Sequence, residues 1–233
     1  IHCARGWPHS PVTDAPMDEE RGPLGFLGGS FDPVHVGHLR GAMVVREALN
    51  LARVDLVPAA QSPLKPETIL TGAHRLAMLE LAIADVPGLG VDARELDRAG
   101  PSFTIDTLEA LRAQYGGTRV LVWIIGSDSL LTLPRWARWP ELLSLAHVAV
   151  LDRPGSATPP EEVTSWLIQH RIERPELSLR PAGGVVMLQQ PVLDIASSQI
   201  RDVFASGNSP RFLLPDAVME YIERNTLFGP GKS

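Results

Sequence analysis

The stretch LGFLGGSFDPVHVGH, residues 24–38, decides the fold of this chain. It opens with a short apolar run typical of a buried strand and continues into Gly28 and Gly29, which permit close backbone approach and unusual φ angles. Asp32-Pro33 then marks a turn, after which a helix-like pattern begins. A strand, a glycine-rich loop and a helix start together form an anion site, because free N–H groups and the helix dipole face the loop. We therefore predict that this loop binds a phosphate group.

Outward from this stretch, short apolar runs alternate with helix-like segments. We predict strands over 24–28, 54–58, 89–94, 119–125, 147–151 and 184–189. We predict helices near 36–50, 73–85, 105–115, 139–145, 160–171, 197–206 and 215–225. The run 120–125 is apolar on both alternating faces, as a central parallel strand covered by helices on both sides should be. The alternation predicts an α/β fold with a doubly wound parallel sheet, whose site lies at the carboxyl ends of the strands.

The second helical segment shows the apolar spacing of an amphipathic helix. Leu76, Leu79 and Ile83 recur there at three- and four-residue intervals.

The chain has 233 residues, enough for one good-sized α/β domain and few for two. Residues 1–22 have no apolar periodicity, so we expect a disordered or loosely attached N-terminal extension, with Met17 as the natural start. We expect residues 23–228 to form a single domain with C-terminal helices, and residues 229–233 to form a tail.

Composition excludes several classes of protein. Hydrophobic residues make up 44% of the chain, and no apolar run approaches the roughly 18 residues of a membrane span. The single cysteine, Cys3, excludes an internal disulfide framework, and no secretory signal is recognisable, so we expect a cytoplasmic protein. The net charge of −6 argues against a nucleic-acid-binding surface. We expect neither nucleic acid nor membrane as a partner, and composition leaves homo-oligomerisation open.

His35 and His38 are three residues apart, so both lie on one face of the first helical turn, aimed at whatever the loop holds. The dinucleotide fingerprint G-x-G-x-x-G is absent, which argues against a dehydrogenase. The terminal Gly231-Lys-Ser233 imitates the end of a P-loop, but Thr226 stands where its first glycine should be. Zinc proteases space their histidines i, i+4 around a glutamate, and this pair does not. A purely structural pair that caps the helix start remains the alternative to phosphate binding.

Two blocks of sequence resemble one enzyme superfamily. GGSFDPVHVGH is similar to the signature of the HIGH-type nucleotidyltransferases, whose histidine pair contacts the phosphates of ATP. The second block, IASSQIR over 195–201, resembles the I-S-S-T-x-x-R motif of the same superfamily, with Ala196 where serine is usual and Ser198 in place of threonine. The resemblance implies a Rossmann-like nucleotidyltransferase fold from about Leu24 to Phe228.

Landmarks between the two blocks resemble the nicotinate mononucleotide adenylyltransferases in particular. They are PLKP (63–66), RLAMLE (75–80), Glu95-Leu96, PSFT (101–104) with Thr107-Leu108, IIGSDSL (124–130), Trp136 and RPG (153–155). Leu64 stands where family members often carry histidine. Lys65 is one of only two lysines in the chain.

The resemblance implies a role for each site residue. It implies catalytic positions at His35, His38, Lys65 and Arg201. It implies ATP contacts from Gly28, Gly29, Ser30, Phe31, Ile195, Ser197 and Ser198. It implies contacts with the acceptor nucleotide from Thr104, Gly126, Asp128, Trp136 and Arg153. From the residues alone, Thr104 and Asp128 could instead be helix caps, and Trp139 and Trp166 are core or surface aromatics.

The implied reaction joins the AMP part of ATP to nicotinate mononucleotide, with release of pyrophosphate. We expect Mg²⁺ to be bound through the ATP phosphates, with no dedicated metal ligands from the protein. The alternatives are a related adenylyltransferase that uses nicotinamide mononucleotide or pantetheine phosphate, and an inactive nucleotide-binding regulator of the same fold. Release of pyrophosphate separates the enzymes from the regulator.

Overall fold

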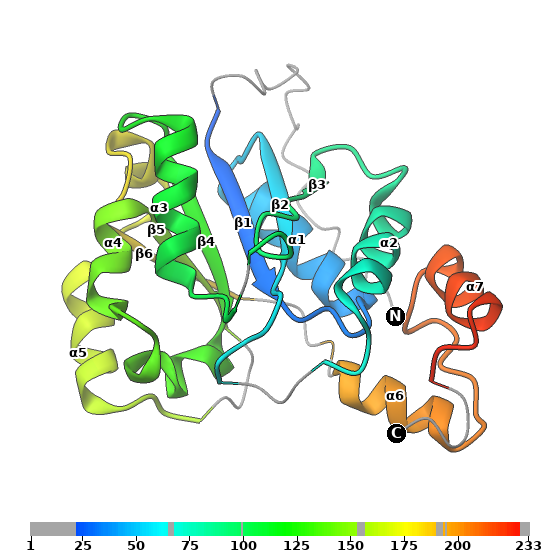
Figure 1. Ribbon diagram of the computed structural model, residues 1–233. Helices are drawn as coiled ribbons and strands as arrows, with labels where there is room; N and C mark the ends of the chain where they lie inside the picture. The colour runs from blue at the N-terminus through cyan, green and yellow to red at the C-terminus, as the bar shows by residue number, and fades with distance from the viewer. Residues whose placement is uncertain are drawn as a thin grey trace, which may run out of the picture.

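The computed structural model describes residues 22–64, 68–98, 100–152, 157–189, 193 and 195–228. Within these residues, six strands form one parallel sheet in the order β3-β2-β1-β4-β5-β6 (Figure 1). Their bounds are Leu24–Gly29 (β1), Arg53–Pro58 (β2), Leu89–Val91 (β3), Leu121–Gly126 (β4), His147–Asp152 (β5) and Val185–Gln189 (β6). The predicted doubly wound α/β fold is confirmed, although the third strand ends at Val91 rather than at residue 94.

The helices follow the predicted order. They are Val36–Ala48 (α1), Gly72–Ile83 (α2), Thr104–Tyr115 (α3), Leu142–Leu145 (α4), Glu161–His170 (α5), Ser197–Ala205 (α6) and Asp216–Arg224 (α7). Short 3-10 helices were not predicted: Ser127–Leu131 (η1), Leu133–Arg135 (η2), Trp139–Glu141 (η3) and Arg174–Leu179 (η4). The helix predicted over 139–145 is therefore split between η3 and α4. None of the helices among the described residues is long and apolar enough to cross a bilayer.

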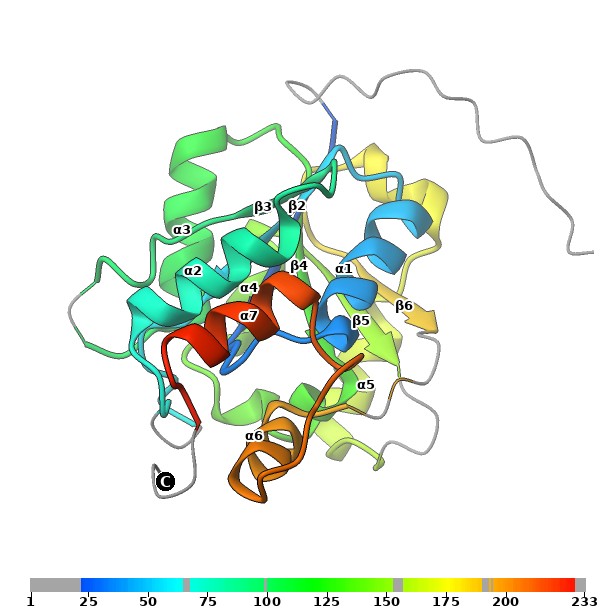
Figure 2. The ribbon, with the colours of Figure 1, turned by 90° about the vertical axis from the view of Figure 1, so that its right-hand side faces the viewer.

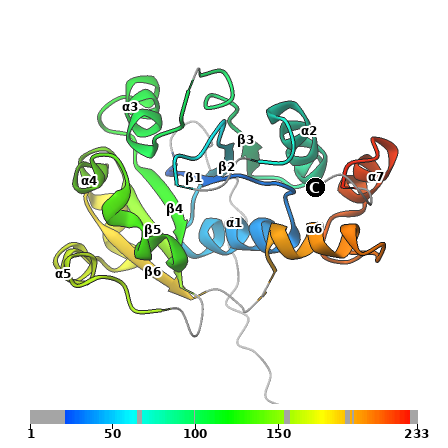
Figure 3. The same ribbon diagram turned by 60° about the horizontal axis from the view of Figure 1, so that its bottom comes forward.

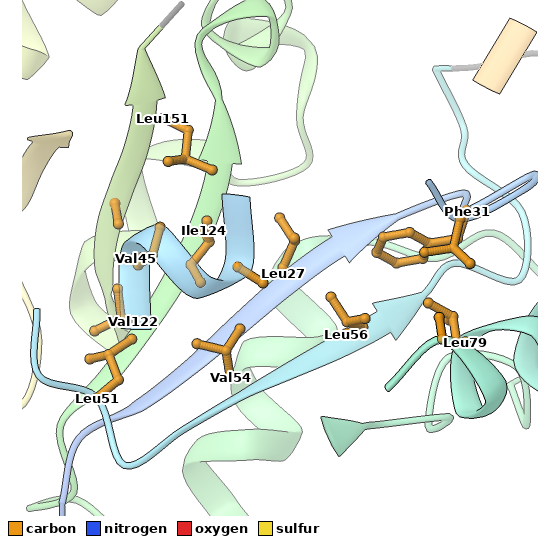
Figure 4. Close-up of a cluster of buried hydrophobic side chains, with 14 of the residues drawn as sticks. Leu27, Phe31, Val45, Leu51, Val54, Leu56, Leu79, Val122, Ile124 and Leu151 are labelled. Atoms are coloured by element: carbon orange, nitrogen blue, oxygen red, sulfur yellow. The ribbon is translucent and has the colours of Figure 1, made fainter. Parts of the chain in front are cut away.

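Both faces of the sheet are buried, as its central strand illustrates. Along β4, Val122 and Ile124 belong to one apolar cluster, whereas Trp123 and Ile125 belong to the other. The first cluster lies between the sheet and α1, α2, α6 and α7. Figure 4 shows part of it, with Val45 of α1 and Leu79 of α2 beside residues of the strands. The second lies between the sheet and α3, α4 and α5. Burial on both faces explains why these strands are almost continuously apolar.

The buried face of helix α2 includes a charged residue. Its buried side chains are Arg75, Met78, Leu79 and Ala82, whereas Leu76 and Ile83 are only partly covered. The observed stripe has the i, i+3, i+4, i+7 spacing of an amphipathic helix but includes a charged residue. Arg75 is tolerated there because its guanidinium donates to backbone carbonyls.

The two C-terminal helices pack on the sheet's own cluster. Ile200 of α6 and Val218 of α7 lie in the same cluster as Leu27 of β1. Helix α7 lies along α2 (Figure 2), where His74 Nδ1 and Tyr221 Oη are 2.9 Å apart. These contacts place α6 and α7 against the half of the fold that contains β1.

Some predictions fall outside the described residues. They concern the extension at 1–21, the tail at 229–233, and the site residues Lys65 and Arg153.

Candidate active site

The order of the strands reverses at β1. The chain leaves β1 through α1 to reach β2 on one side, and it later enters β4 on the other side. Ligands of doubly wound folds bind where the strand order reverses in this way. Figure 3 turns the carboxyl ends of the strands toward the viewer, and α6 lies beside α1 there.

The loop from β1 to α1 is held in a compact conformation. Phe31 is 1% exposed and has a φ of +50°, in the left-handed region. Gly28 lies against Trp123 of the neighbouring strand, where an added Cβ would stand 2.7 Å from the indole Cζ2. A side chain at this position would collide with the ring, so glycine is required at the end of β1.

The two histidines meet as the spacing predicted. Their rings stack with centroids 3.7 Å apart and planes 25° apart, and the edge of His38 faces Phe31 at 5.0 Å. His35 is 2% exposed, whereas His38 is partly exposed. The backbone N–H of His35 donates to His38 Nδ1 at 3.4 Å. His38 therefore also takes part in capping the helix.

The helix start offers fewer free N–H groups than we predicted. The N–H of Val36, the first residue of α1, donates to the carbonyl of Leu213 at 3.0 Å. The N–H of His35 is engaged by His38. The imidazoles and the side chains of α6 must therefore carry more of any phosphate binding than the sequence suggested.

Helix α6 joins the second motif directly to the first. Arg201 Nη1 donates to the carbonyl oxygen of Asp32 at 2.6 Å and lies 3.8 Å from its carboxylate. Ser197 Oγ donates to the carbonyl oxygen of Pro33 at 2.9 Å. These contacts bring together two blocks of sequence more than 160 residues apart in the chain.

The remaining residues of the second motif lie at the start of α6. Ala196 is its N-cap, and the Ala196 N–H donates to Gln199 Oε1 at 2.8 Å. Gln199 thus supplies half of a capping box. Ser198 is exposed, and Ile195 lies beside Gly37 of α1.

Asp32 and Arg75 organise the site, although neither was predicted to do so. Asp32 is 4% exposed and accepts hydrogen bonds from the N–H groups of Ile69 and Leu70, at 2.8 and 3.2 Å. Arg75 is 1% exposed and donates to the carbonyl of Ser30 at 2.8 Å. Burial lowers the pKa of Arg75, and the nearby charge of Asp32 opposes this effect. An acid before proline and a charged residue within an apolar helical stripe are the sequence signals that could have identified them.

The predicted acceptor residues follow β4 or begin α3. Gly126 ends β4, and Asp128 is exposed in η1. Trp136 is the C-cap of η2, and its partly buried side chain packs on the second cluster. Thr104 is the first residue of α3.

The alternatives for these residues can now be tested. The N-cap of η1 is Gly126 and that of α3 is Phe103, so the reading of Asp128 and Thr104 as caps is wrong. Trp166 is a core aromatic, 7% exposed, and packs edge-on against Trp139 at 5.5 Å.

The chain is similar in sequence to known proteins over most of its length. Residues 26–203 match the cytidylyltransferase-like family. A protein of Pseudomonas putida strain GB-1, named "Probable nicotinate-nucleotide adenylyltransferase", is 44% identical over 206 residues, which cover 88% of this chain and 94% of that protein. A protein of the same name from Pseudomonas aeruginosa strain UCBPP-PA14 is 41% identical and is covered over 96% of its length.

Solved structures show the same fold. The nicotinic acid mononucleotide adenylyltransferase of Plasmodium falciparum, in complex with NaAD, superimposes with a TM-score of 0.67 at 16% identity. The match covers 89% of this chain and 98% of that one. A second structure of that enzyme, in complex with APC, gives a TM-score of 0.65. The family match and the Pseudomonas relatives together show that the chain belongs to the cytidylyltransferase-like family and, within it, to the nicotinate-nucleotide adenylyltransferases.

Proposed function

We propose that the protein transfers AMP from ATP to nicotinate mononucleotide and releases pyrophosphate, in the biosynthesis of NAD. The names of the Pseudomonas relatives support this reaction. The observation that carries the proposal is the pair of bonds from Ser197 and Arg201 to the carbonyls of Pro33 and Asp32. These bonds join the histidine loop and the late helix into one site at the reversal of the strand order.

The reaction is an attack by the acceptor's phosphate on the α-phosphorus of ATP. The nucleophile is already an anion, so no general base is required. Catalysis then consists of positioning the two nucleotides and neutralising the charge that develops on the leaving pyrophosphate. This demand matches a site with cationic and imidazole side chains.

The stacked histidines supply one positive charge between them. A phosphate charge about 4 Å from an imidazole favours the imidazolium by about 4 kcal/mol at an effective dielectric constant of 20. The helix N-terminus opposes the cation by only about 0.3–1 kcal/mol. Rings whose centroids are 3.7 Å apart repel each other when both are charged, so one imidazolium is shared by the pair.

We assign the triphosphate of ATP to the β1–α1 loop and the start of α6. Arg201 keeps part of its guanidinium exposed and can bind a phosphate oxygen while it holds Asp32. Gly28, Gly29, Ser30 and Phe31 would line the loop side, and Ile195, Ser197 and Ser198 the helix side. Lys65, in the segment after β2, is assigned a catalytic charge from the sequence alone.

Mg²⁺ would enter this site bound to the phosphates of ATP rather than to protein side chains. Among the described residues, no group of three or more His, Cys, Asp or Glu side chains could hold a metal ion. Both carboxylate oxygens of Asp32 already accept backbone N–H groups. The ion would therefore be held by phosphate oxygens, where it offsets their negative charge, and His35, His38 and Arg201 position those phosphates.

We assign the acceptor to the residues after β4 and at the start of α3. Trp136 would stack on the pyridine ring, and Asp128 and Gly126 would meet the ribose. Thr104 and the adjacent backbone N–H groups would receive the nicotinate carboxylate. Arg153, which follows β5, completes the set from the sequence alone.

A pyrophosphate-release assay with Mg²⁺-ATP tests the proposal. Nicotinate mononucleotide should give the highest kcat/KM among nicotinate mononucleotide, nicotinamide mononucleotide and pantetheine phosphate. A preference for another acceptor would contradict the assignment of nicotinate mononucleotide as substrate but would still show an adenylyltransferase. Absence of pyrophosphate with all three acceptors would indicate a nucleotide-binding regulator instead.

A further inference from the structure

Glu95 is a buried carboxylate outside the residues assigned so far to the reaction. It lies in the segment after β3 and is 4% exposed. Its Oε1 accepts a hydrogen bond from the hydroxyl of Thr107 at 2.6 Å. Burial raises the pKa of Glu95, and the hydroxyls of Thr107 and Ser102 oppose this effect. A buried carboxylate is stable only with such donors, so its presence here calls for a specific role.

The hydrogen bonds around Thr107 have a fixed direction. Arg98 Nη1 donates to Thr107 Oγ1 at 2.9 Å, and a guanidinium can only donate. The single hydroxyl proton of Thr107 is therefore directed to Glu95. Arg98 Nη2 also donates to the carbonyl of Asp106 at 3.3 Å. The first turn of α3 is thus held by Glu95 and Arg98 together.

Ser102, whose hydroxyl acts on the pKa of Glu95, is itself held by the segment after β2. The N–H of Ala60 donates to Ser102 Oγ at 3.0 Å. The N–H of Ser102 donates to the carbonyl of Gln61 at 2.8 Å. Ser102 therefore fastens the segment that precedes α3 to the segment that follows β2.

The network continues to the loop assigned to ATP. Arg75 Nη2 donates to the carbonyl of Ala60 at 3.3 Å, and its Nη1 donates to the carbonyl of Ser30 at 2.8 Å. Hydrogen bonds thus connect Ser30 through Arg75 and Ala60 to Ser102. Glu95 and its donor Thr107 lie next to the Ser102 end of this path.

We propose that Glu95 is a positioning residue for the acceptor mononucleotide. Its donor Thr107 lies in the first turn of α3, three residues after Thr104, and Ser102 lies two residues before Thr104. By holding Thr107, Glu95 fixes the place of Thr104 and of the adjacent N–H groups. The inference rests on the proposed function, which assigns these groups to the nicotinate carboxylate.

Only an acceptor of hydrogen bonds fits the position of Glu95. In a Glu95→Gln variant, one carboxylate oxygen is replaced by an NH₂ donor, and the bond from Thr107 loses its charge assistance. The expected consequence is a displaced first turn of α3 and a KM for nicotinate mononucleotide raised about tenfold. The KM for ATP should stay within about twofold, because Arg75 holds Ser30 independently of Glu95.

The experiment measures kcat and both KM values for the wild type, Glu95→Gln and the control Asp97→Asn. Asp97 is an exposed acid two residues away, and its variant should match the wild type. A second pair guards against misfolding. Thr107→Val removes the donor to Glu95 and should raise the KM for nicotinate mononucleotide, whereas Thr107→Ser keeps the donor and should restore it.

Two outcomes would overturn the proposal. The first is an unchanged KM for nicotinate mononucleotide in both Glu95→Gln and Thr107→Val. The second is an equal rise in both KM values, which indicates general loss of structure. Turnover of nicotinate mononucleotide by the wild type tests the proposed function separately from the role of Glu95. A wild type that does not use nicotinate mononucleotide contradicts the proposed function and this role with it, whereas an active wild type with unchanged variants contradicts the role alone.

Discussion

Arg201 donates from Nη1 to the backbone carbonyl of Asp32 at 2.6 Å, across 169 positions of the chain. The carboxylate of the same aspartate accepts the N–H groups of Ile69 and Leu70. One residue in the β1–α1 loop therefore binds both the segment before α2 and the late helix α6. The position of the guanidinium depends on this loop, and any phosphate it binds is placed relative to the histidines.

Arg201→Lys should lower kcat/KM for ATP by about tenfold or more. A lysine retains the charge but loses the planar fork that can bond Asp32 and a phosphate oxygen at once. Arg211→Lys is the matched control, since Arg211 is exposed and its guanidinium lies over the ring of Phe212. Steady-state kinetics at varied ATP measure the effect. Equal activity of the two variants would remove Arg201 from the phosphate site.

His38→Ala should lower kcat more than it raises the KM for ATP. Loss of one group that stabilises developing charge typically costs about 2.7–4 kcal/mol, or 10²–10³ in kcat. His38 also accepts the N–H of His35, so the alanine variant loses a cap as well as an imidazole. His38→Asn separates the two roles, because its side-chain oxygen can still accept at a helix start. A normal kcat in His38→Asn would leave only the structural role.

Arg112 should determine stability without affecting the reaction. At the end of α3 it donates to the carbonyls of Leu145, Gly116, Arg119 and Pro181. Removal of a charged donor from several carbonyls should lower the free energy of unfolding by about 2 kcal/mol. These carbonyls belong to segments that precede β4, β5 and β6, at the amino ends of the strands. The site lies at the carboxyl ends, so kcat should not change.

Arg138 provides the matched control for Arg112. Its ion pairs with Glu109 and Glu141, at 2.9 and 2.6 Å, are exposed on all three side chains. Such exposed pairs contribute little to stability. Denaturant unfolding of Arg112→Met and Arg138→Met therefore tests whether burial of the carbonyls, rather than loss of a charge, sets the difference. Equal losses in the two variants would contradict this account.

His147 should make stability depend on pH. Its Nδ1 accepts the N–H of Gly184 at 3.0 Å and its Nε2 donates to the carbonyl of Arg180 at 2.8 Å, which defines a neutral ring. Burial lowers the pKa of His147 below its usual 6.5. As pH falls through about 6.5, the unfolded chain therefore takes up a proton that the folded chain does not. The free energy of unfolding therefore decreases as the pH falls, by at most about 1.4 kcal/mol per pH unit.

The measurement compares the free energy of unfolding between pH 5 and 8 in the wild type, His147→Asn and His170→Asn. His147→Asn should be less stable at pH 8 but should depend less on pH below 6.5. Burial raises the pKa values of Asp55 and Glu95, which acts in the opposite direction but equally in all three proteins. The difference between the curves thus isolates His147. Parallel curves would show that His147 takes up its proton in the folded state.

The sequence predicted the elements of the fold because their signals are local. Short apolar runs marked each strand of the sheet, and the Gly28-Gly29 pair with His35 and His38 marked the loop and its helix. The 3-10 helices η1 and η2 after β4 were missed, since segments of three to five residues are too short to show a period. The burial of Arg75 in α2 was not predicted, because a charged residue is expected at the surface.

What the sequence could not predict depends on contacts between distant segments. The N–H of Val36 was expected to be free, but the carbonyl of Leu213 accepts it. Asp32 read as a turn residue, whereas it is a buried acceptor for Ile69 and Leu70. Neither partner can be inferred from spacing along the chain. They follow only from the packing of α6, α7 and the segment before α2 around the β1–α1 loop.

Discrimination between acid and amide acceptors is the sharpest test of the acceptor site. We expect nicotinate mononucleotide to exceed its amide by roughly 10²-fold in kcat/KM. Ring stacking on Trp136 treats the two alike, so choice must come from donors such as the Thr104 hydroxyl. A carboxylate satisfies two donors, whereas an amide turns its own NH₂ toward one of them and leaves it unpaired, at a cost of about 1–3 kcal/mol.

Variants at Thr104 and Trp136 should therefore separate choice from affinity. Among the described residues no side chain caps α3, so Thr104→Val leaves the helix start intact and should narrow the ratio of the two kcat/KM values. Trp136→Ala should weaken both acceptors with little change in their ratio, and Trp136→Phe should recover much of the loss because it keeps an aromatic face. The ratio is measured for the two mononucleotides at saturating Mg²⁺-ATP. A ratio near one in the wild type, or a ratio that Thr104→Val leaves unchanged, would mean that the donors for the carboxylate lie elsewhere than at the start of α3.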